Sequence, residues 1–85
     1  MSRKDKMVRR LLSRPRDFTY EELVKLLNQF GYEEVKKGKT SGSRRAFIKH
    51  TTMHMIRLHK PHPGNLLKTY QVVYIIDELK KSGMI

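Results

Sequence analysis

The chain has 85 residues, enough for one domain with a single modest core, and its formal net charge is +11, from 19 Lys and Arg against 8 Asp and Glu. It contains no cysteine, which excludes a disulfide framework and a thiolate metal site. No stretch approaches the roughly 20 apolar residues of a membrane span, and no signal peptide pattern is visible. We therefore expect a cytoplasmic protein without a membrane partner.

The first predicted element is a short helix over residues 4–13. Its apolar residues recur at helical spacing on one stripe, and Pro15 ends the pattern because it cannot continue a helix. This stripe either covers the core or forms an exposed patch for a partner. Its members are Met7, Val8, Leu11 and Leu12.

The second helix begins after Thr19, whose hydroxyl and the carboxylate of Glu22 are spaced as a capping box. An apolar stripe follows, and Gly31 supplies the left-handed residue that ends the helix. The stripe is predicted to face the core and consists of Tyr20, Leu23, Val24, Leu27 and Phe30.

Three strands are predicted next, over residues 32–37, 44–50 and 53–59. The last two alternate in hydrophobicity and are joined by a tight link at Thr51 and Thr52, which is typical of a hairpin. We expect Ala46, Ile48, Ile56 and Leu58 on the inner face of the sheet. The outer face would then carry Arg45, Phe47, Lys49, Met55, Arg57 and His59.

The proline-rich segment 60–65 cannot continue a central strand, and a last helix is expected from Thr69 to about Gly83. Its core stripe is Val72, Ile75, Ile76 and Leu79. The element order predicts an α+β fold in which two helices cover one face of a three-stranded antiparallel sheet, after a short N-terminal helix. We treat residues 1–85 as one domain, with 1–15 as a helical extension and 19–83 as the core.

The charges are distributed unevenly along this order. Between Glu34 and Asp77 there is no Asp or Glu, and the same stretch contains all four histidines of the chain. A surface of one sign attracts polyanions, of which nucleic acid is the commonest in cells, and imidazole exchanges a proton near neutral pH. This composition suits the binding and cutting of RNA.

Two segments carry a resemblance to a known family. Residues 42–47, GSRRAF, and residues 56–65, IRLHKPHPGN, together with the helix over 69–82, resemble the HicA toxin family over roughly residues 19–83. The resemblance implies a double-stranded-RNA-binding-domain-like fold and the activity of a ribosome-independent mRNA interferase. It also implies silencing by a HicB antitoxin that covers the active surface.

The sequence departs from the family pattern at one position. The family's essential histidine directly follows the glycine-serine segment, where this chain has Arg44 and Arg45. Arginine cannot act as a general base, but it can grip a phosphate through two parallel hydrogen bonds and stabilise developing charge. His59 is then the candidate for proton transfer, with His62 as a second catalytic candidate and Arg44 as the phosphate-gripping catalytic residue. His54 shares parity with Ile56 and is expected to lean toward the helices.

The candidate RNA contacts surround the hairpin. Phe47 either stacks on an unpaired base or packs beneath an antitoxin or a third element of the fold. Ser43, with Gly42, either presents backbone N–H groups to a phosphate or forms a plain entry turn. The predicted RNA-binding residues are Ser43, Arg44, Arg45, Phe47, Lys49, Arg57 and Lys60.

A metal site is not expected, because no carboxylate or thiolate accompanies His59 and His62. The sequence therefore predicts a metal-independent endoribonuclease without a cofactor, acting on mRNA in a toxin–antitoxin stress response. The alternative is a non-catalytic RNA-binding module that has lost the family histidine. A third reading, a ribosome-associated basic protein, rests on charge alone.

Overall fold

The computed structural model describes residues 3–35, 44–61 and 64–85. Helix α1 (Arg3–Leu12) and helix α2 (Tyr20–Gln29) precede strands β1 (Glu33–Glu34), β2 (Arg44–Lys49) and β3 (His54–His59), and helix α3 (Thr69–Lys81) follows. The strands form one antiparallel sheet in the order β1-β2-β3. This α+β, double-stranded-RNA-binding-domain-like arrangement confirms the predicted fold class.

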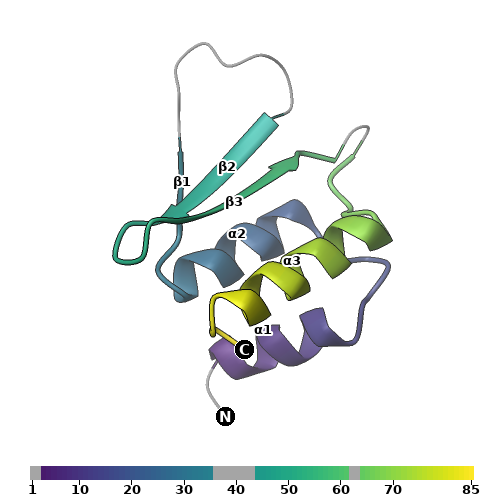
Figure 1. Ribbon diagram of the computed structural model, residues 1–85. Coiled ribbons are helices and arrows are strands. Elements are labelled where there is room, and N and C mark those ends of the chain that lie inside the picture. The colour runs from purple at the N-terminus through teal and green to yellow at the C-terminus, as the bar shows by residue number, and fades with distance from the viewer. Residues whose placement is uncertain (1–2, 36–43, 62–63) are drawn as a thin grey trace.

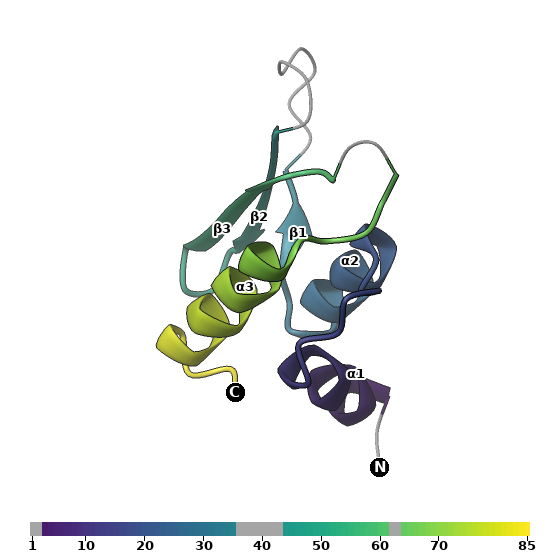
Figure 2. The ribbon, with the colours of Figure 1, turned by 90° about the vertical axis from the view of Figure 1, so that its right-hand side faces the viewer.

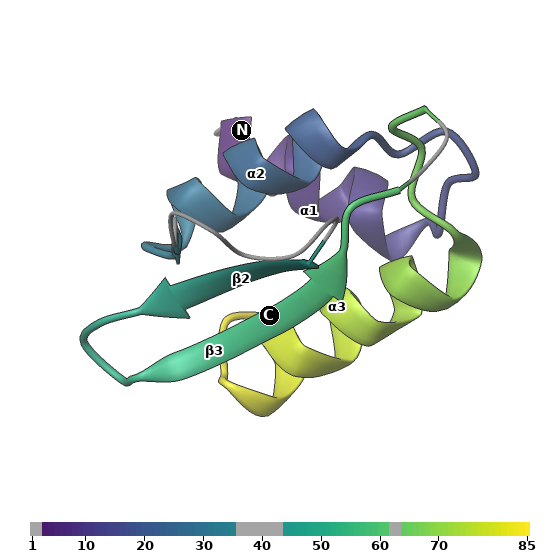
Figure 3. The same cartoon turned by 90° about the horizontal axis from the view of Figure 1, so that it is seen from above.

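The sheet has one covered and one open face. Helices α2 and α3 lie side by side beneath it, and α1 lies on the far side of those two helices (Figures 1 and 2). Seen from above, β2 and β3 lie in front of the helices with no helix over them (Figure 3). The open face is therefore the surface on which the strands can present side chains to a partner.

Helix α2 starts as its sequence predicts. The Thr19 hydroxyl accepts a hydrogen bond from the backbone N–H of Glu22 at 3.0 Å, and the Glu22 carboxylate accepts one from the backbone N–H of Thr19 at 3.0 Å. Gly31 then takes a positive φ of 88°, which an L side chain adopts only with strain. The chain can thus turn directly from α2 into β1.

The apolar stripe of α1 covers the core rather than forming a free patch. Leu11 is fully buried, and Met7 and Val8 pack against the core cluster, whereas Leu12 remains exposed. An ion pair fixes the helix to α2, because Arg10 Nε lies 2.6 Å from Glu22 Oε2. Within the described parts of the chain, none of the helices has both the length and the apolar content needed to cross a bilayer.

The predicted faces are correct for β3 and wrong for β2. Ile56 and Leu58 are buried on the helix side as expected, but so is Phe47, which has no exposed surface. The register pairs Phe47 with Ile56, and directly opposed residues of an antiparallel pair share one face of the sheet. Ala46 is paired with Arg57, so it lies on the open face together with Arg44 and Ile48.

Candidate nucleic-acid interface

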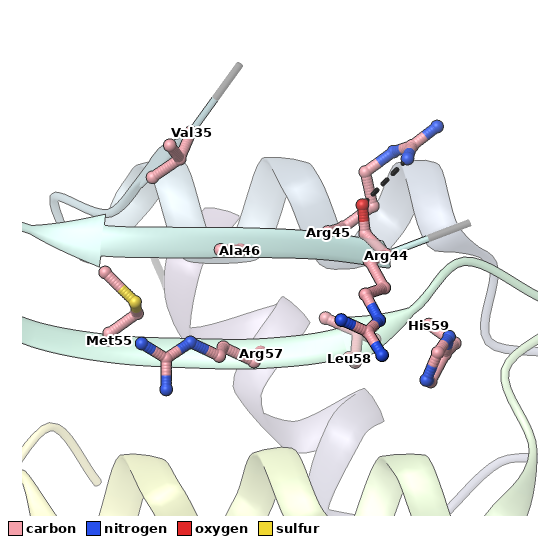
Figure 4. Close-up of a pocket in the computed structure, with 8 residues that line it drawn as sticks. All are labelled: Val35, Arg44, Arg45, Ala46, Met55, Arg57, Leu58 and His59. Atoms are coloured by element: carbon pink, nitrogen blue, oxygen red, sulfur yellow. Dashed lines mark hydrogen bonds between the residues drawn. The ribbon is translucent and has the colours of Figure 1, made fainter. Parts of the chain in front are cut away.

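The open face brings three cationic or titratable side chains together at one end of the hairpin. Arg44 pairs with His59, and Ala46 pairs with Arg57, so all four residues share this face. In Figure 4 the Arg44 side chain leaves β2 and lies over β3, between Arg57 and His59. Around them is a shallow hollow of about 450 Å³, lined by Val35, Arg44, Arg45, Ala46, Met55, Arg57, Leu58 and His59.

The hollow is electropositive. Arg44, Arg57 and His59 are all solvent-exposed. By register Glu33 also belongs to the open face, but it lies opposite Ile48 near the hairpin turn, where its carboxylate is 3.4 Å from His50 Nε2. Among the described residues no carboxylate forms an ion pair with Arg44 or Arg57, so both guanidinium groups can bind a phosphate.

Helix α3 holds the strand that carries His59 and Arg57. The side-chain amide of Gln71, which is 4% exposed, donates a hydrogen bond to the backbone carbonyl of His59 at 2.8 Å. The Tyr74 hydroxyl accepts a hydrogen bond from the backbone N–H of Arg57 at 3.2 Å. Because β3 is an edge strand, these bonds satisfy backbone groups that would otherwise point outward, and they anchor the backbone of β3 to α3.

Sequence reasoning missed Gln71 and Tyr74. A signal was present for Gln71, because a glutamine sits beside Val72 on the side of the last helix that faces the core, and a buried amide needs partners. The position of Tyr74 on the border of the apolar stripe gave a weaker signal.

Arg45 and Lys49 are turned toward the rest of the protein. Arg45 Nε lies 3.5 Å from Glu34 Oε2, and its Nη1 donates to the Arg44 carbonyl at 2.9 Å. Lys49 Nζ donates to the Phe30 carbonyl at 2.9 Å. Both residues alternate with Arg44 along β2 and so belong to the helix-facing side of the strand, although Arg45 also lines the hollow.

Lys60 follows β3 and lies near the start of α2. Its Nζ is 5.4 Å from the centre of the Tyr20 ring, a cation–π geometry. The Tyr20 hydroxyl donates to Glu34 Oε2 at 2.8 Å. The pKa of the phenol is raised mainly by burial and, second, by this hydrogen bond to a carboxylate. Tyr20 is therefore a neutral structural donor at neutral pH, and Lys60 does not line the hollow.

Phe47 cannot stack on a base, contrary to one of the two roles predicted for it. Its ring is fully buried and lies 6.2 Å from the ring of Tyr20, measured between centroids. The fold places it beneath the sheet because the hairpin register sets it opposite Ile56. Phe47 therefore has the packing role, and it packs within the hydrophobic core of this chain.

The remaining histidines lie away from the open-face group. His54 leans toward the helices as predicted, with Nδ1 2.5 Å from the Tyr32 hydroxyl and Nε2 3.1 Å from Glu78 Oε1. His50 is at the hairpin turn beside Glu33. Two predicted site residues, Ser43 and His62, lie outside the described residues. Within the described segments no three His, Cys, Asp or Glu side chains gather as a metal site.

The fold and this face define a class of protein: a small double-stranded-RNA-binding-domain-like protein with a cationic open sheet face. The comparison with family models specifies the class further, because residues 20–84 match the model of the HicA toxin of bacterial toxin–antitoxin systems. The chain belongs to this family, which implies a cognate antitoxin as its partner. No curated protein and no solved structure gave a significant match.

Proposed function

We propose that this toxin is a metal-independent endoribonuclease that cleaves mRNA without the ribosome and is neutralised by a HicB-type antitoxin. The observation that carries the proposal is the group of Arg44, Arg57 and His59 on the open face. Family membership supports the same reading. An mRNA substrate would place the protein in the cytoplasm, and the burial of Leu11 supports treating residues 1–85 as one domain.

The proposed reaction uses the 2′-hydroxyl of the substrate as the nucleophile. Its oxygen attacks the adjacent phosphorus and loses its proton to a base, the bond to the 5′-oxygen breaks, and that oxygen receives a proton. The products are a 2′,3′-cyclic phosphate and a free 5′-hydroxyl. His59 is our candidate for proton transfer, a role that supplies on the order of 10²–10⁴-fold.

The arginines would stabilise the charge that builds on phosphorus. Arg44 and Arg57 can each donate two hydrogen bonds to phosphate oxygens, and such bonds are strongest where charge develops in the transition state. His62 is the candidate for the second proton transfer by sequence. A surface that grips the chain and moves a proton at one phosphate needs no metal ion for this reaction.

The test is a cleavage assay on single-stranded RNA in EDTA with the purified full chain. We expect fragments ending in a cyclic phosphate and no cleavage of the all-DNA analogue. We also expect the activity to be lost when the antitoxin encoded by the neighbouring gene is co-expressed with the toxin. RNA that stays intact but bound would instead support the non-catalytic module, the reading favoured by Arg44 at the place of the family histidine. Absence of both binding and cleavage would overturn the proposal.

A further inference from the structure

A second depression opens beside the cationic hollow, between β3 and α3. It has a volume of about 260 Å³, its walls are mostly apolar, and it is lined by Arg57, Leu58, His59, Tyr70, Gln71 and Tyr74. The first three of these residues also line the open-face hollow. A chain whose phosphates lie over Arg57 and His59 therefore has this groove directly at its side.

Tyr70 gives the groove an unusual wall. It is 66% exposed, and among the described residues it is the one aromatic side chain that lies largely in solvent. Tyr70 and Tyr74 are four positions apart in α3, so they lie on neighbouring turns of one helix face. A large exposed ring next to bound phosphates can serve as a stacking platform for a base.

The groove also offers polar groups near its apolar walls. The Tyr74 hydroxyl already accepts a hydrogen bond from the backbone N–H of Arg57, which leaves its own proton available to donate. The amide of Gln71 is occupied differently, because its oxygen accepts from the backbone N–H of Lys68 at 3.0 Å and its nitrogen donates to the His59 carbonyl. Gln71 therefore shapes the floor, and Tyr74 is the group that can meet the edge of a ligand.

We propose that the groove between β3 and α3 binds one unpaired nucleobase of the RNA, stacked on Tyr70, while the attached phosphates lie over Arg57 and His59. This inference rests on the proposed function and gives it a substrate class, single-stranded RNA. The cationic wall formed by Arg57, and the lack of any acidic residue among the described lining residues, favour a polyanion over an apolar peptide. A base in a duplex is stacked and paired, so it cannot enter.

The experiment measures the affinity of the full chain for a single-stranded 2′-fluoro RNA, which lacks the nucleophile and stays intact. One adenine is replaced by 2-aminopurine, whose fluorescence falls on stacking. We expect Tyr70→Ala to weaken binding about 5- to 150-fold, the effect of losing one base–aromatic stack, and to abolish the fluorescence change. Tyr70→Phe keeps the ring and should retain wild-type affinity and quenching.

Val73→Ala is the matched control, because Val73 is 39% exposed on α3 but does not line the groove. Blunt duplex RNA should bind the wild type and Tyr70→Ala equally. If the wild type binds single strands and Tyr70→Ala binds them as tightly, the base groove is wrong while the RNA proposal stands. The same holds if Tyr70→Ala weakens only antitoxin binding. A wild type that binds no RNA overturns both.

Discussion

Arg44 lies directly opposite His59 in the β2–β3 pair, on the face of the sheet that no helix covers. The two residues come from positions fifteen apart in sequence, and only the hairpin brings them together (Figure 4). Metal-free phosphoryl transfer uses a cation to stabilise developing charge and an imidazole to move a proton, and the two positions carry one of each. The pairing thus sets a histidine of this chain opposite Arg44, the position where the resemblance to the HicA family implies a histidine.

We predict that His59→Ala lowers the rate of RNA cleavage at least tenfold, since proton transfer by a placed group is worth about 10²–10⁴-fold. The rate is measured on single-stranded RNA in EDTA, with RNA affinity measured alongside to separate binding from chemistry. His50→Ala is the control, because His50 lies at the far end of the hairpin beside Glu33. Equal losses in the two variants would remove His59 from the mechanism.

Arg44→His should cleave RNA about tenfold or more faster than Arg44→Gln, because both variants lose the arginine charge and only the histidine supplies a second proton-transfer group. It would set two imidazoles opposite each other across β2 and β3, so that one can act as base and the other as acid. Arg44→Gln, which removes the charge without adding an imidazole, is the comparison variant. A rate that falls equally in both would mean that the arginine charge matters more than a base here.

RNA affinity should fall with salt, with a log–log slope that reports the number of phosphates neutralised, about 0.7 for each on a single strand. Arg57→Gln and Arg44→Gln should each make the slope shallower by roughly one such step. Lys25→Gln should leave it unchanged, since Lys25 is exposed on α2, which packs on the covered face. If the salt slopes of Arg57→Gln, Arg44→Gln and Lys25→Gln are equal, the assignment of the phosphate contacts to the open face is refuted.

The helices could be predicted from sequence because their signals are local. Thr19, Glu22 and Gly31 mark the two ends of α2 through bonds and backbone angles that involve only near neighbours. The stripe of α3 likewise recurs at 3.6-residue spacing and is buried as expected. The first helix ends at Leu12, one residue before the predicted end at residue 13, and the signal for this end was Pro15, which cannot continue a helix.

The inner face of β2 could not be assigned from its own alternation. Ala46 and Ile48 on one side and Phe47 on the other give both faces an apolar member, so period-two spacing alone does not choose between them. The missing information was the register: the four residues between β2 and β3 place Lys49 opposite His54, and hence Phe47 opposite Ile56. Since Ile56 was already assigned inward, the register would have reversed β2 and moved Arg44 to the open face.

This reversal can be tested by stability. Phe47→Ala should lower the free energy of unfolding by about 3–5 kcal/mol, the usual cost of a cavity left by a buried aromatic ring. Ile48→Ala should cost less, because Ile48 lies on the open face and is only partly buried. Urea denaturation of both variants measures the difference. The opposite order of stabilities would restore the face assignment that sequence alone suggested.

The Arg10–Glu22 pair should make stability sensitive to acid. The hydrogen bond from Arg10 holds the pKa of the Glu22 carboxyl below its ordinary value of 4.5, and the Thr19 backbone N–H adds to this against the effect of burial. The unfolded chain then takes up a proton at higher pH than the folded one, so the stabilisation is present above pH 4.5 and is lost as the pH falls through the folded pKa. Urea titrations over this range should show that the free energy of unfolding falls more steeply with acid for the wild type than for Glu22→Gln.

The control is the same comparison in the background of Arg10→Gln. There the main cause of the pKa shift is absent, so replacing Glu22 by glutamine should change the acid dependence of stability much less. Parallel curves for the wild type and Glu22→Gln would contradict this coupling between α1 and α2.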